Sequence, residues 1–387
     1  MTTTSYWLSP PQGTQKHKSD VLIVGAGITG LSIAFWIKKL SPQTHVLVVD
    51  EGDFGRGATG RNAGFNTAGS THYLAHLFQK HGEAHARTLW AFKQDSLRLM
   101  REEIFSKLNC GFQQWGSFTL YRDQTRLEEH ASIAARLHAG DVPQVSSQEL
   151  KAKGLHDFAG ALSFSHEACL SPKLFLEQLS SLLKAQGVEF ILNEKILWSE
   201  NAGKRWVGTR QTFEADQTFL ALNGYLPRFD NSISWVSPKR AQMIALDFNK
   251  NVLSGNYYDP DHKVYFRSDP LAAAPTLLVG GMRLLEEATE NDDEDKVSAI
   301  IQNALHHYAE SLFSQKFQVR ARWSGVMGFS ANELPFMRDL PGLQHCHFVG
   351  GYSGHGMGMA FGVARVAALK SLGFECAEEN LLQGVQG

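Results

Sequence analysis

The chain has 387 residues, a length that suits two domains or one large α/β domain better than a single ordinary core. Apolar residues make up 43% of it, charged residues 20%, and the formal net charge is −2, a balance typical of globular proteins that offers no basic surface for a nucleic acid. Its four cysteines are scattered without a C-x-x-C pair, which excludes a cysteine-rich zinc site or a disulfide framework and favours a reducing, cytoplasmic compartment.

An uncharged run from Val21 to Ile37 follows the basic residues Lys16–Lys18 and imitates a targeting signal. The run is shorter than the roughly 20 apolar residues of a membrane span. It also contains three glycines, and no small-residue cleavage site follows it. We therefore expect an uncleaved N-terminus and no membrane span.

The same run is typical of a strand, a glycine turn and a helix. After the apolar stretch Val21–Val24, glycines at Gly25, Gly27 and Gly30 give the spacing G-x-G-x-x-G, with Ile28 opening the helix. The first glycine allows the tight turn, the second lets the main chain approach a pyrophosphate, and the third allows close helix–strand packing. This spacing also occurs in glycine turns of α/β domains that bind no nucleotide.

A second strand, "THVLVVDEG", raises the specificity of that pattern. It ends in Asp50 and Glu51, and Asp50 stands twenty residues after Gly30, where an acidic side chain accepts a hydrogen bond from an adenosine ribose hydroxyl. An acid rather than an arginine argues against a 2′-phosphate. Together these elements predict a dinucleotide site, and they leave NAD and FAD open.

The loop that follows, "DEGDFGRGATGRNAGFNTAG", favours FAD. Its main-chain amides, with Arg61 or Asn62, are suited to line the diphosphate and flavin end of the cofactor, and Ala58 and Thr59 belong to the same turn. The alternative is a flexible loop without a ligand.

A glycine-rich segment near the end, "GGYSGHGMGMAFG", supports the same choice. A glycine turn that leads into a helix directs N–H groups at an anion, and in a flavoenzyme that anion is the N1–C2=O edge of the reduced flavin. Bare main chain approaches the flat ring without obstruction. The predicted contacts are Gly351, Gly354, His355, Gly356, Met357 and Gly358. His355 has an alternative interpretation as a surface or core histidine.

These three glycine motifs, in this order, resemble the D-amino-acid oxidase-like FAD-dependent oxidoreductases, the family of glycine oxidase, sarcosine oxidase and γ-glutamylputrescine oxidoreductase. "TSYW" at Thr4–Trp7 and "GATGRNAG" look most like the γ-glutamylputrescine branch. The resemblance implies an α/β protein with a Rossmann-like FAD-binding domain (1–75, 165–226 and 331–387). That domain is interleaved with a mixed-sheet α+β substrate domain (76–164 and 227–330). It also implies that Ile196 lies near the adenine and Asn223 near the diphosphate.

The resemblance further implies the chemistry: a hydride passes from a C–N bond of an amine or amino acid to the flavin N5, the imine is hydrolysed, and O2 is reduced to H2O2. FAD is expected to be non-covalent, because "RWSGVMGFSANE" lacks the flavin-linked cysteine of sarcosine oxidase. No metal is expected. "TLLVGG" offers Leu277 and Leu278 where that enzyme has a lysine, so a dehydrogenase with another electron acceptor stays an alternative. A flavin-binding protein without turnover is a third.

Candidate substrate contacts come from the strand-like region. Tyr265 and Arg267 are two residues apart on one predicted strand and so share a face, where they are suited to clamp a carboxylate. A packed tyrosine beside a surface arginine is the alternative. Trp323 is predicted to form a wall over the substrate or flavin, or else to pack in the core, and His72 is a further candidate for the flavin's face. The amphipathic helix expected over Glu83–Leu108 is assigned to the substrate domain.

Overall fold

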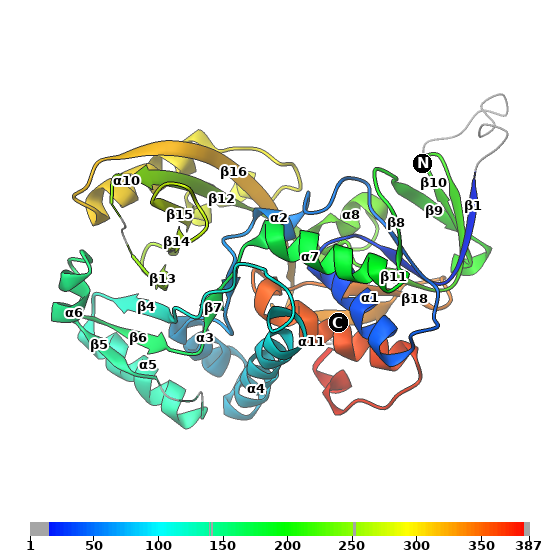
Figure 1. The fold of residues 1–387 in the computed structure, drawn as a ribbon. Helices are drawn as coiled ribbons and strands as arrows, with labels where there is room; N and C mark the ends of the chain where they lie inside the picture. Colours follow the sequence, from blue (N-terminus) through cyan, green and yellow to red (C-terminus); the bar gives the residue numbers. More distant parts are fainter. Residues whose placement is uncertain (1–14, 139, 141, 251–252, 383–387) are drawn as a thin grey trace.

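The structure is a computed structural model that describes residues 15–138, 140, 142–250 and 253–382. "TSYW" at Thr4–Trp7 lies outside these residues. Two large sheets lie side by side, one carrying the first glycine motif and the other the strand-rich middle of the chain (Figure 1). No helix in the described part of the chain is long and apolar enough to cross a membrane.

The first sheet is built around parallel strands that bring both glycine motifs to one edge. Its main path runs β17 (Phe336–Asp339), β18 (Cys346–Gly350), β11 (Thr212–Leu220), β1 (Lys16–Val24), β2 (Val46–Val49), β8 (Glu189–Ile191). Strand β10 (Arg205–Gly208) extends it through antiparallel pairing with β11, and β9 (Ile196–Glu200) pairs antiparallel with β10. Because β1, β2, β11 and β18 are parallel, their carboxyl ends meet at the same edge.

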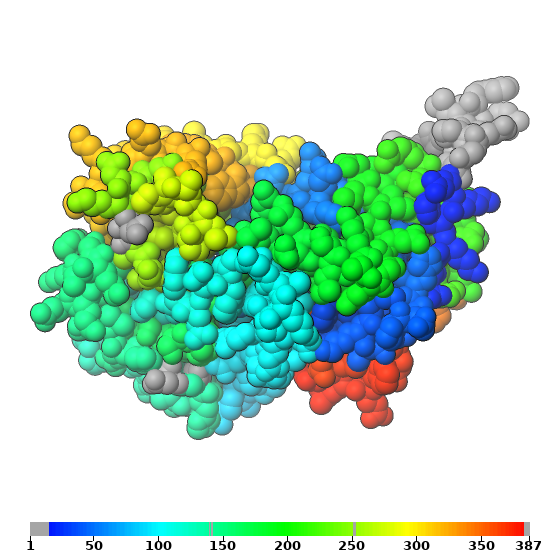
Figure 2. Space-filling view, viewed as in Figure 1, coloured from blue at the N-terminus to red at the C-terminus, as the bar shows by residue number. Residues whose placement is uncertain are grey.

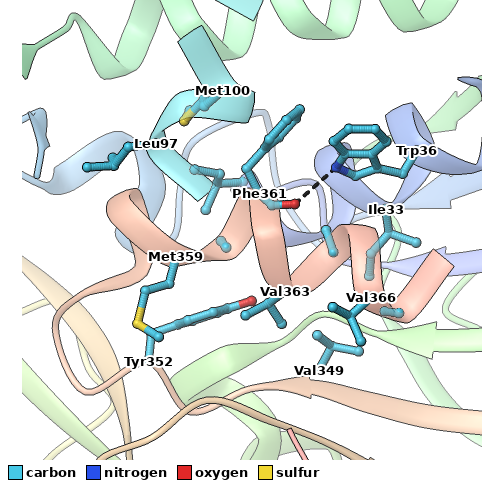
Figure 3. Packing of buried hydrophobic residues seen from close by; sticks show 14 of the residues in the cluster. Ile33, Trp36, Leu97, Met100, Val349, Tyr352, Met359, Phe361, Val363 and Val366 are labelled. Carbon is cyan, nitrogen blue, oxygen red and sulfur yellow. Dashed lines mark hydrogen bonds between the residues drawn. The ribbon is translucent and has the colours of Figure 1, made fainter. Parts of the chain in front are cut away.

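Three helices pack together on one face of this sheet. They are α1 (Ile28–Leu40), α11 (Gly356–Ser371) and α4 (Glu83–Met100). The indole N–H of Trp36 on α1 donates to the carbonyl oxygen of Phe361 on α11 over 3.0 Å, and Leu97 and Met100 of α4 lie against the same core (Figure 3). The two glycine motifs are thus held together by the helices that they open.

The helix expected over Glu83–Leu108 is α4, which continues as a short π-helical turn, η1 (Arg101–Phe105). This helix packs on α11 beside the first sheet, and its Trp90 also contacts Phe164, so it touches residues of both predicted domains. Small residues let α4 approach α11 closely: the hydroxyl of Ser96 accepts a hydrogen bond from the main-chain N–H of Gly362 at 3.1 Å, and α4 and α11 share the core of the first sheet. The amphipathic pattern identified the helix but could not say which apolar surface covers it.

The second sheet is mostly antiparallel. Its order is β16 (Phe317–Ser330), β12 (Val236–Phe248), β15 (Thr276–Gly281), β14 (Val264–Asp269), β13 (Asn256–Asp259), β4 (Ser117–Tyr121), β6 (Gly160–Phe164), β5 (Gln144–Ser146). Helix α10 (Ala299–Leu312) covers β12 and β15, and α6 (Ser147–Ala152) contributes to the same core. Helices α3 (Thr71–His81) and α5 (Gln124–Arg136) pack on each other nearby. All these strands fall within the ranges 76–164 and 227–330.

The remaining helices, turns and strands lie outside the two large sheets. They are α2 (Ala58–Arg61), α7 (Pro172–Ala185), α8 (Leu226–Phe229), the 3₁₀ turns η2 (Asn201–Gly203), η3 (Asn223–Tyr225), η4 (Arg283–Glu286) and η5 (Ala377–Leu382), α9 (Glu287–Glu290), and the small sheet of β3 (Phe65–Asn66) and β7 (Ala168–Cys169). In the space-filling view the green segment containing α7 covers the middle of this face, between the two sheets (Figure 2). Arg61 of α2 donates to the carbonyl oxygen of Ser324 on β16 at 3.0 Å, which fixes the junction.

Candidate cofactor and substrate site

A cavity of about 790 Å³ lies where the two sheets meet. At one end it is lined by the carboxyl edge of the first sheet and by the N-termini of α1 and α11. At the other it is lined by strands β12, β13, β14 and β16 of the second sheet. Residues of both glycine motifs and residues of the second sheet thus line one cavity.

The β1–α1 turn supplies main chain to this cavity. Gly25, Gly27 and Ile28 line it. The N-cap residue Gly27 gives α1 no side-chain cap, and the first turn holds no acidic residue. Thr59 accepts the first amide N–H, that of Ile28, and the positive end of the helix faces the cavity. Gly30 does not line the cavity: a Cβ there would overlap the carbonyl oxygen of Gly25, which is the close helix–strand packing expected of the third glycine.

The C-terminal motif reaches the same cavity. Gly354, His355, Gly356, Met357 and Gly358 line it, and α11 likewise begins without a side-chain cap or an acidic first turn. Two uncapped helix N-termini therefore open on one space.

One predicted contact of this motif lies elsewhere. Gly351 does not line the cavity and occupies a turn with φ of 78°, where a Cβ would meet the ring of Phe336. Its amide N–H donates to the side chain of Asn223, which does line the cavity. Gly351 therefore supports the conformation of the turn and the side chain of Asn223 without lining the cavity itself.

The loop after β2 lines the middle of the cavity with Ala58, Thr59, Arg61 and Asn62. Many of the polar groups of this loop form hydrogen bonds within the protein. The hydroxyl of Thr59 accepts the amide N–H of Ile28 at 2.9 Å, while the side-chain amide of Asn62 donates to the carbonyls of Ala58 and Thr59. Arg61 forms an ion pair with Asp295 at 3.0 Å. These bonds order the loop and leave its main chain facing the cavity.

Asp50 and Glu51 line the cavity, as does Ile196 at the start of β9. The two carboxylate oxygens of Asp50 accept the amide N–H groups of Ala26 at 2.7 Å and Gly52 at 2.9 Å. Burial nevertheless raises the pKa of this carboxyl. A carboxylate oxygen accepts more than one hydrogen bond, so a ribose contact remains a prediction.

At the second-sheet end the cavity is lined by neutral hydrogen-bonding side chains. Tyr258 and Tyr265 are cross-strand neighbours on β13 and β14, and burial raises the pKa of each phenol to about 12. Burial, with help from the charge of Arg126, lowers the pKa of His72 to about 4. Burial also holds the pKa of His355 well below its ordinary value. All four side chains are uncharged near pH 7.

The carboxylate clamp predicted at Arg267 is wrong. Arg267 is 2% exposed, does not line the cavity, and donates from its guanidinium to the carbonyls of Ala63, Ser268 at 2.8 Å and Leu170 at 3.1 Å. Tyr265 does share its face of β14, but the loop before β3 covers the arginine. With its donors committed to the main chain, Arg267 secures that loop.

Trp323 is likewise not a wall of the cavity. Its ring N–H donates to the carbonyl oxygen of Arg61 at 2.9 Å, and Trp323 is not among the lining residues. Trp323 is half-buried and belongs to none of the described apolar cores, so the core-packing alternative is not borne out either.

Several lining residues carried no signal in the sequence. The main ones are Tyr73, Met243, Tyr258, Lys263, Met282 and Arg283. The ring of Tyr73 stacks on that of His355 with centroids 3.8 Å apart. These residues sit on helices, strands and turns without a motif, and only the tertiary packing brings them together. Among the described residues no group of three or more acidic, histidine or cysteine side chains is placed to hold a metal ion.

The family model described as "DAO: FAD dependent oxidoreductase" matches residues 20–369. The chain belongs to this family. It is similar to "Probable oxidoreductase OrdL" of Haemophilus influenzae, with 24% identity over 94% of this chain and 85% of the relative. It is also similar to the γ-glutamylputrescine oxidoreductase of Escherichia coli, with 22% identity over 87% and 80%. Glycine oxidase from Geobacillus kaustophilus has the same fold, with a TM-score of 0.77 and 19% identity over 96% of this chain and all of that one.

The site of this DAO-family oxidoreductase fits FAD. The cavity extends without interruption from the first sheet to the second and exposes bare main chain at Gly27 and Gly354. The N-termini of α1 and α11, whose N-cap residues provide no side-chain cap, open on it and favour negatively charged groups. The glycines of the C-terminal motif leave room for a flat ring. The residues predicted for the adenine and diphosphate ends, Ile196 and Asn223, line the same run. The four described cysteines are free, and none lines the cavity.

Proposed function

We propose that the protein oxidises a C–N bond of an amine or amino acid and passes the electrons to O2. In the balanced reaction a primary amine, water and O2, in equal amounts, give a carbonyl compound, ammonia and H2O2. The observation that carries the proposal is the single cavity, which joins a dinucleotide groove to a chamber lined by Tyr258, Tyr265 and His72. FAD, when bound, supplies the two-electron chemistry that side chains lack.

The two histidines provide hydrogen bonds of defined polarity. Nδ1 of His355 lies 3.1 Å from the carbonyl oxygen of Ser353, and a carbonyl only accepts, so Nδ1 carries the proton and Nε2 is an acceptor. Nδ1 of His72 accepts from Arg126 at 3.1 Å, so its Nε2 carries the proton and is a donor. The chamber therefore offers a donor and an acceptor without a charge on either ring.

The chamber also favours an uncharged amine, the form whose C–H bond is oxidised. Burial and nearby positive charges both lower the pKa of an ammonium group. Lys263 and Arg283 line the chamber. The imidazole of His72 is neutral, and the phenols of Tyr258 and Tyr265 keep their protons. Substrate that arrives as an ammonium ion thereby gives up its proton to solvent water as it enters the chamber.

The electron acceptor in this proposal is O2, and two observations support that choice. Positive side chains next to the site stabilise the negative charge that develops as dioxygen is reduced. One of the similar structures is also that of an enzyme named an oxidase, glycine oxidase. A dehydrogenase of the same fold is the alternative, and it differs in producing no peroxide.

The test is anaerobic bleaching of the flavin across N-methyl amino acids, D-amino acids and acylated polyamines, followed by a peroxide assay in air. We expect at least one class to bleach the flavin and to yield peroxide. Tyr258→Phe should slow bleaching. Tyr257→Phe, its neighbour on β13 that lies in the core on the opposite face, should leave the rate unchanged.

The outcomes separate the three interpretations of the sequence. Bleaching without peroxide identifies a dehydrogenase. A protein that remains yellow with every amine is a flavin-binding protein without this turnover.

A further inference from the structure

Lys93 is a buried amine that the proposed reaction does not use. It lies in the middle of α4, is 0% exposed, and its Nζ has no hydrogen-bond partner in the described part of the chain. An ammonium ion without a partner is costly inside a protein, so burial holds the pKa of this lysine well below its ordinary value. The structure therefore favours the uncharged amine at this position.

A pair of stacked rings connects Lys93 to the cavity. Its Nζ lies 4.0 Å from the centroid of the Tyr73 ring on α3, and that ring stacks on the ring of His355 with centroids 3.8 Å apart. A ring stacked at this distance fills one face of the phenol, so Nζ lies over the other face. Tyr73 and His355 both line the cavity. Lys93 is thus separated from the space that fits FAD by this pair of rings.

The ring pair stands at the C-terminal glycine motif. His355 is the N-cap residue of α11, and the sequence predicts this motif at the N1–C2=O edge of the reduced flavin, where negative charge develops. At an effective dielectric constant of ~20, an anion about 10 Å away favours the ammonium form of a buried lysine by about 10-fold. On reduction of the flavin, Lys93 thus gains the negative charge that it lacks in the structure.

Glu167 is the acidic group that faces Lys93. It lies between β6 and β7, and its charge favours the ammonium form of the lysine. Its carboxyl group already accepts the amide N–H of Ala68 at 2.6 Å and the hydroxyl of Ser117, and burial raises its own pKa to about 7. Glu167 is therefore only a partial counter-charge near neutral pH, and Lys93 can still respond to a second anion.

The other titratable groups of this cluster belong to α3 and to the start of α11. Burial raises the pKa of the Tyr73 phenol and lowers that of His355, so both are uncharged near pH 7. His76 on α3 pairs with Glu333 at 2.8 Å. Among the described residues none of these groups accepts a hydrogen bond from Nζ of Lys93.

We propose that Lys93 takes up one proton from solvent when the bound flavin is reduced and releases it when the flavin is reoxidised. The proton adds to the lone pair of Nζ, both electrons go to the flavin, and no bond forms between the lysine and the cofactor. The ammonium ion then offsets the negative charge of the reduced cofactor through the ring pair. This inference rests on bound FAD and not on the amine reaction of the proposed function.

The test is the midpoint potential of the FAD-loaded protein, measured with mediator dyes in an electrochemical cell without any amine, from about pH 6.5 to about pH 8.5. For each tenfold change in proton concentration, a two-electron couple shifts by about 30 mV when one proton accompanies the electrons and by about 59 mV when two do. We expect about 59 mV per pH unit in the wild type, with one proton on the flavin and one on Lys93. Lys93→Met should reduce the slope to about 30 mV per pH unit.

Lys93→Arg separates the charge from the proton uptake. A guanidinium keeps its proton in both redox states, so the slope should again be about 30 mV per pH unit, at a potential more positive than that of Lys93→Met. A purely structural role of Lys93 would leave the slope unchanged in both variants. Lys107→Met is the matched control, because that lysine is exposed and pairs with Glu103 at 3.0 Å, and it should keep the wild-type slope.

Two results overturn the inference: a wild-type slope of about 30 mV per pH unit, or a slope of about 59 mV that persists in Lys93→Met. If Lys93→Met does not bind FAD, a slope of about 59 mV in Lys93→Arg overturns it equally. Failure of the proposed function looks different, because then no amine bleaches the flavin while the slopes of wild type and variants still differ.

Discussion

The two ends of the cavity are built from different parts of the polypeptide. The first-sheet end consists of main chain at glycine turns and helix N-termini, with Gly27 and Gly354 on its surface. The second-sheet end consists of side chains, such as Tyr258, Tyr265 and Arg283, presented by strands and a turn. A site built from main chain requires glycine at fixed spacings, which can be recognised in the sequence. A site built from side chains uses residues scattered along the chain, and their roles depend on how the strands pair.

The largest expected effect is at the main-chain end, in Gly30→Val. A side chain there would overlap the carbonyl oxygen of Gly25 and press on Ile23, so α1 could not lie on β1. We expect a loss of more than about 4 kcal/mol in the free energy of unfolding and no bound flavin. Circular dichroism and the ratio of absorbance at roughly 450 nm to that at 280 nm measure the two effects.

Gly356→Ala is the control for that prediction. It lines the cavity, but a Cβ there meets only Tyr352, at ordinary contact distances of 3.6 Å or more. The variant should fold. A folded, yellow Gly30→Val protein would show that the turn tolerates a side chain and that main-chain approach does not define this end.

The comparison also explains which features could be predicted from the sequence. The strand–glycine–helix pattern, the acid after the second strand and the C-terminal glycines depend on local geometry, and they identified the family, the cofactor and most of the lining residues at the first-sheet end. Arg267 and Arg283 show the limit. Both are arginines near a strand end, and their residue types alone do not tell which is committed to carbonyl groups.

That difference arises from long-range packing. Arg267 is sealed by the loop at Ala63, 204 positions earlier in the chain, whereas Arg283 lies on a turn that faces the cavity. The placement of α4 has the same cause, since its apolar stripe fits any apolar surface of the right shape. Sequence periodicity predicts that a face is buried and leaves the partner undetermined.

Arg267→Met sharpens the contrast between the two arginines. It leaves three carbonyl oxygens without their donor in a buried site, so we expect a loss of about 3 kcal/mol in the free energy of unfolding, measured with urea. An Arg267→Met protein with an unchanged free energy of unfolding would contradict this structural role.

A smaller, pH-dependent effect is expected at Glu167, which connects the two ends. Its carboxyl group accepts the amide N–H of Ala68 at 2.6 Å and the hydroxyl of Ser117 on β4, and burial raises its pKa from 4.5 to about 7. The folded state therefore holds a proton that the unfolded chain releases near pH 4.5. Its contribution to stability is complete below that pH and is lost as the pH rises through about 7.

Glu167→Gln keeps the shape and an acceptor but does not titrate. Relative to the wild type, its free energy of unfolding should gain about 2 kcal/mol between roughly pH 5 and pH 8, as followed by urea unfolding across that range. Glu129→Gln is the control, because that side chain lies exposed on α5. Parallel pH profiles for wild type and Glu167→Gln would contradict a raised pKa at this site.

The smallest effect is expected from Trp323→Phe, which tests whether the junction between the ends depends on one hydrogen bond. The variant keeps an aromatic ring on β16 and loses the N–H donor to the carbonyl oxygen of Arg61. We expect a loss of about 1 kcal/mol in the free energy of unfolding with kcat/KM nearly unchanged. Trp198→Phe, on the exposed face of β9, should change neither quantity. If Trp323→Phe instead lowered kcat/KM with full stability, the ring would be in contact with substrate after all. Trp323 would then have to be counted among the side chains that form the second-sheet end of the cavity.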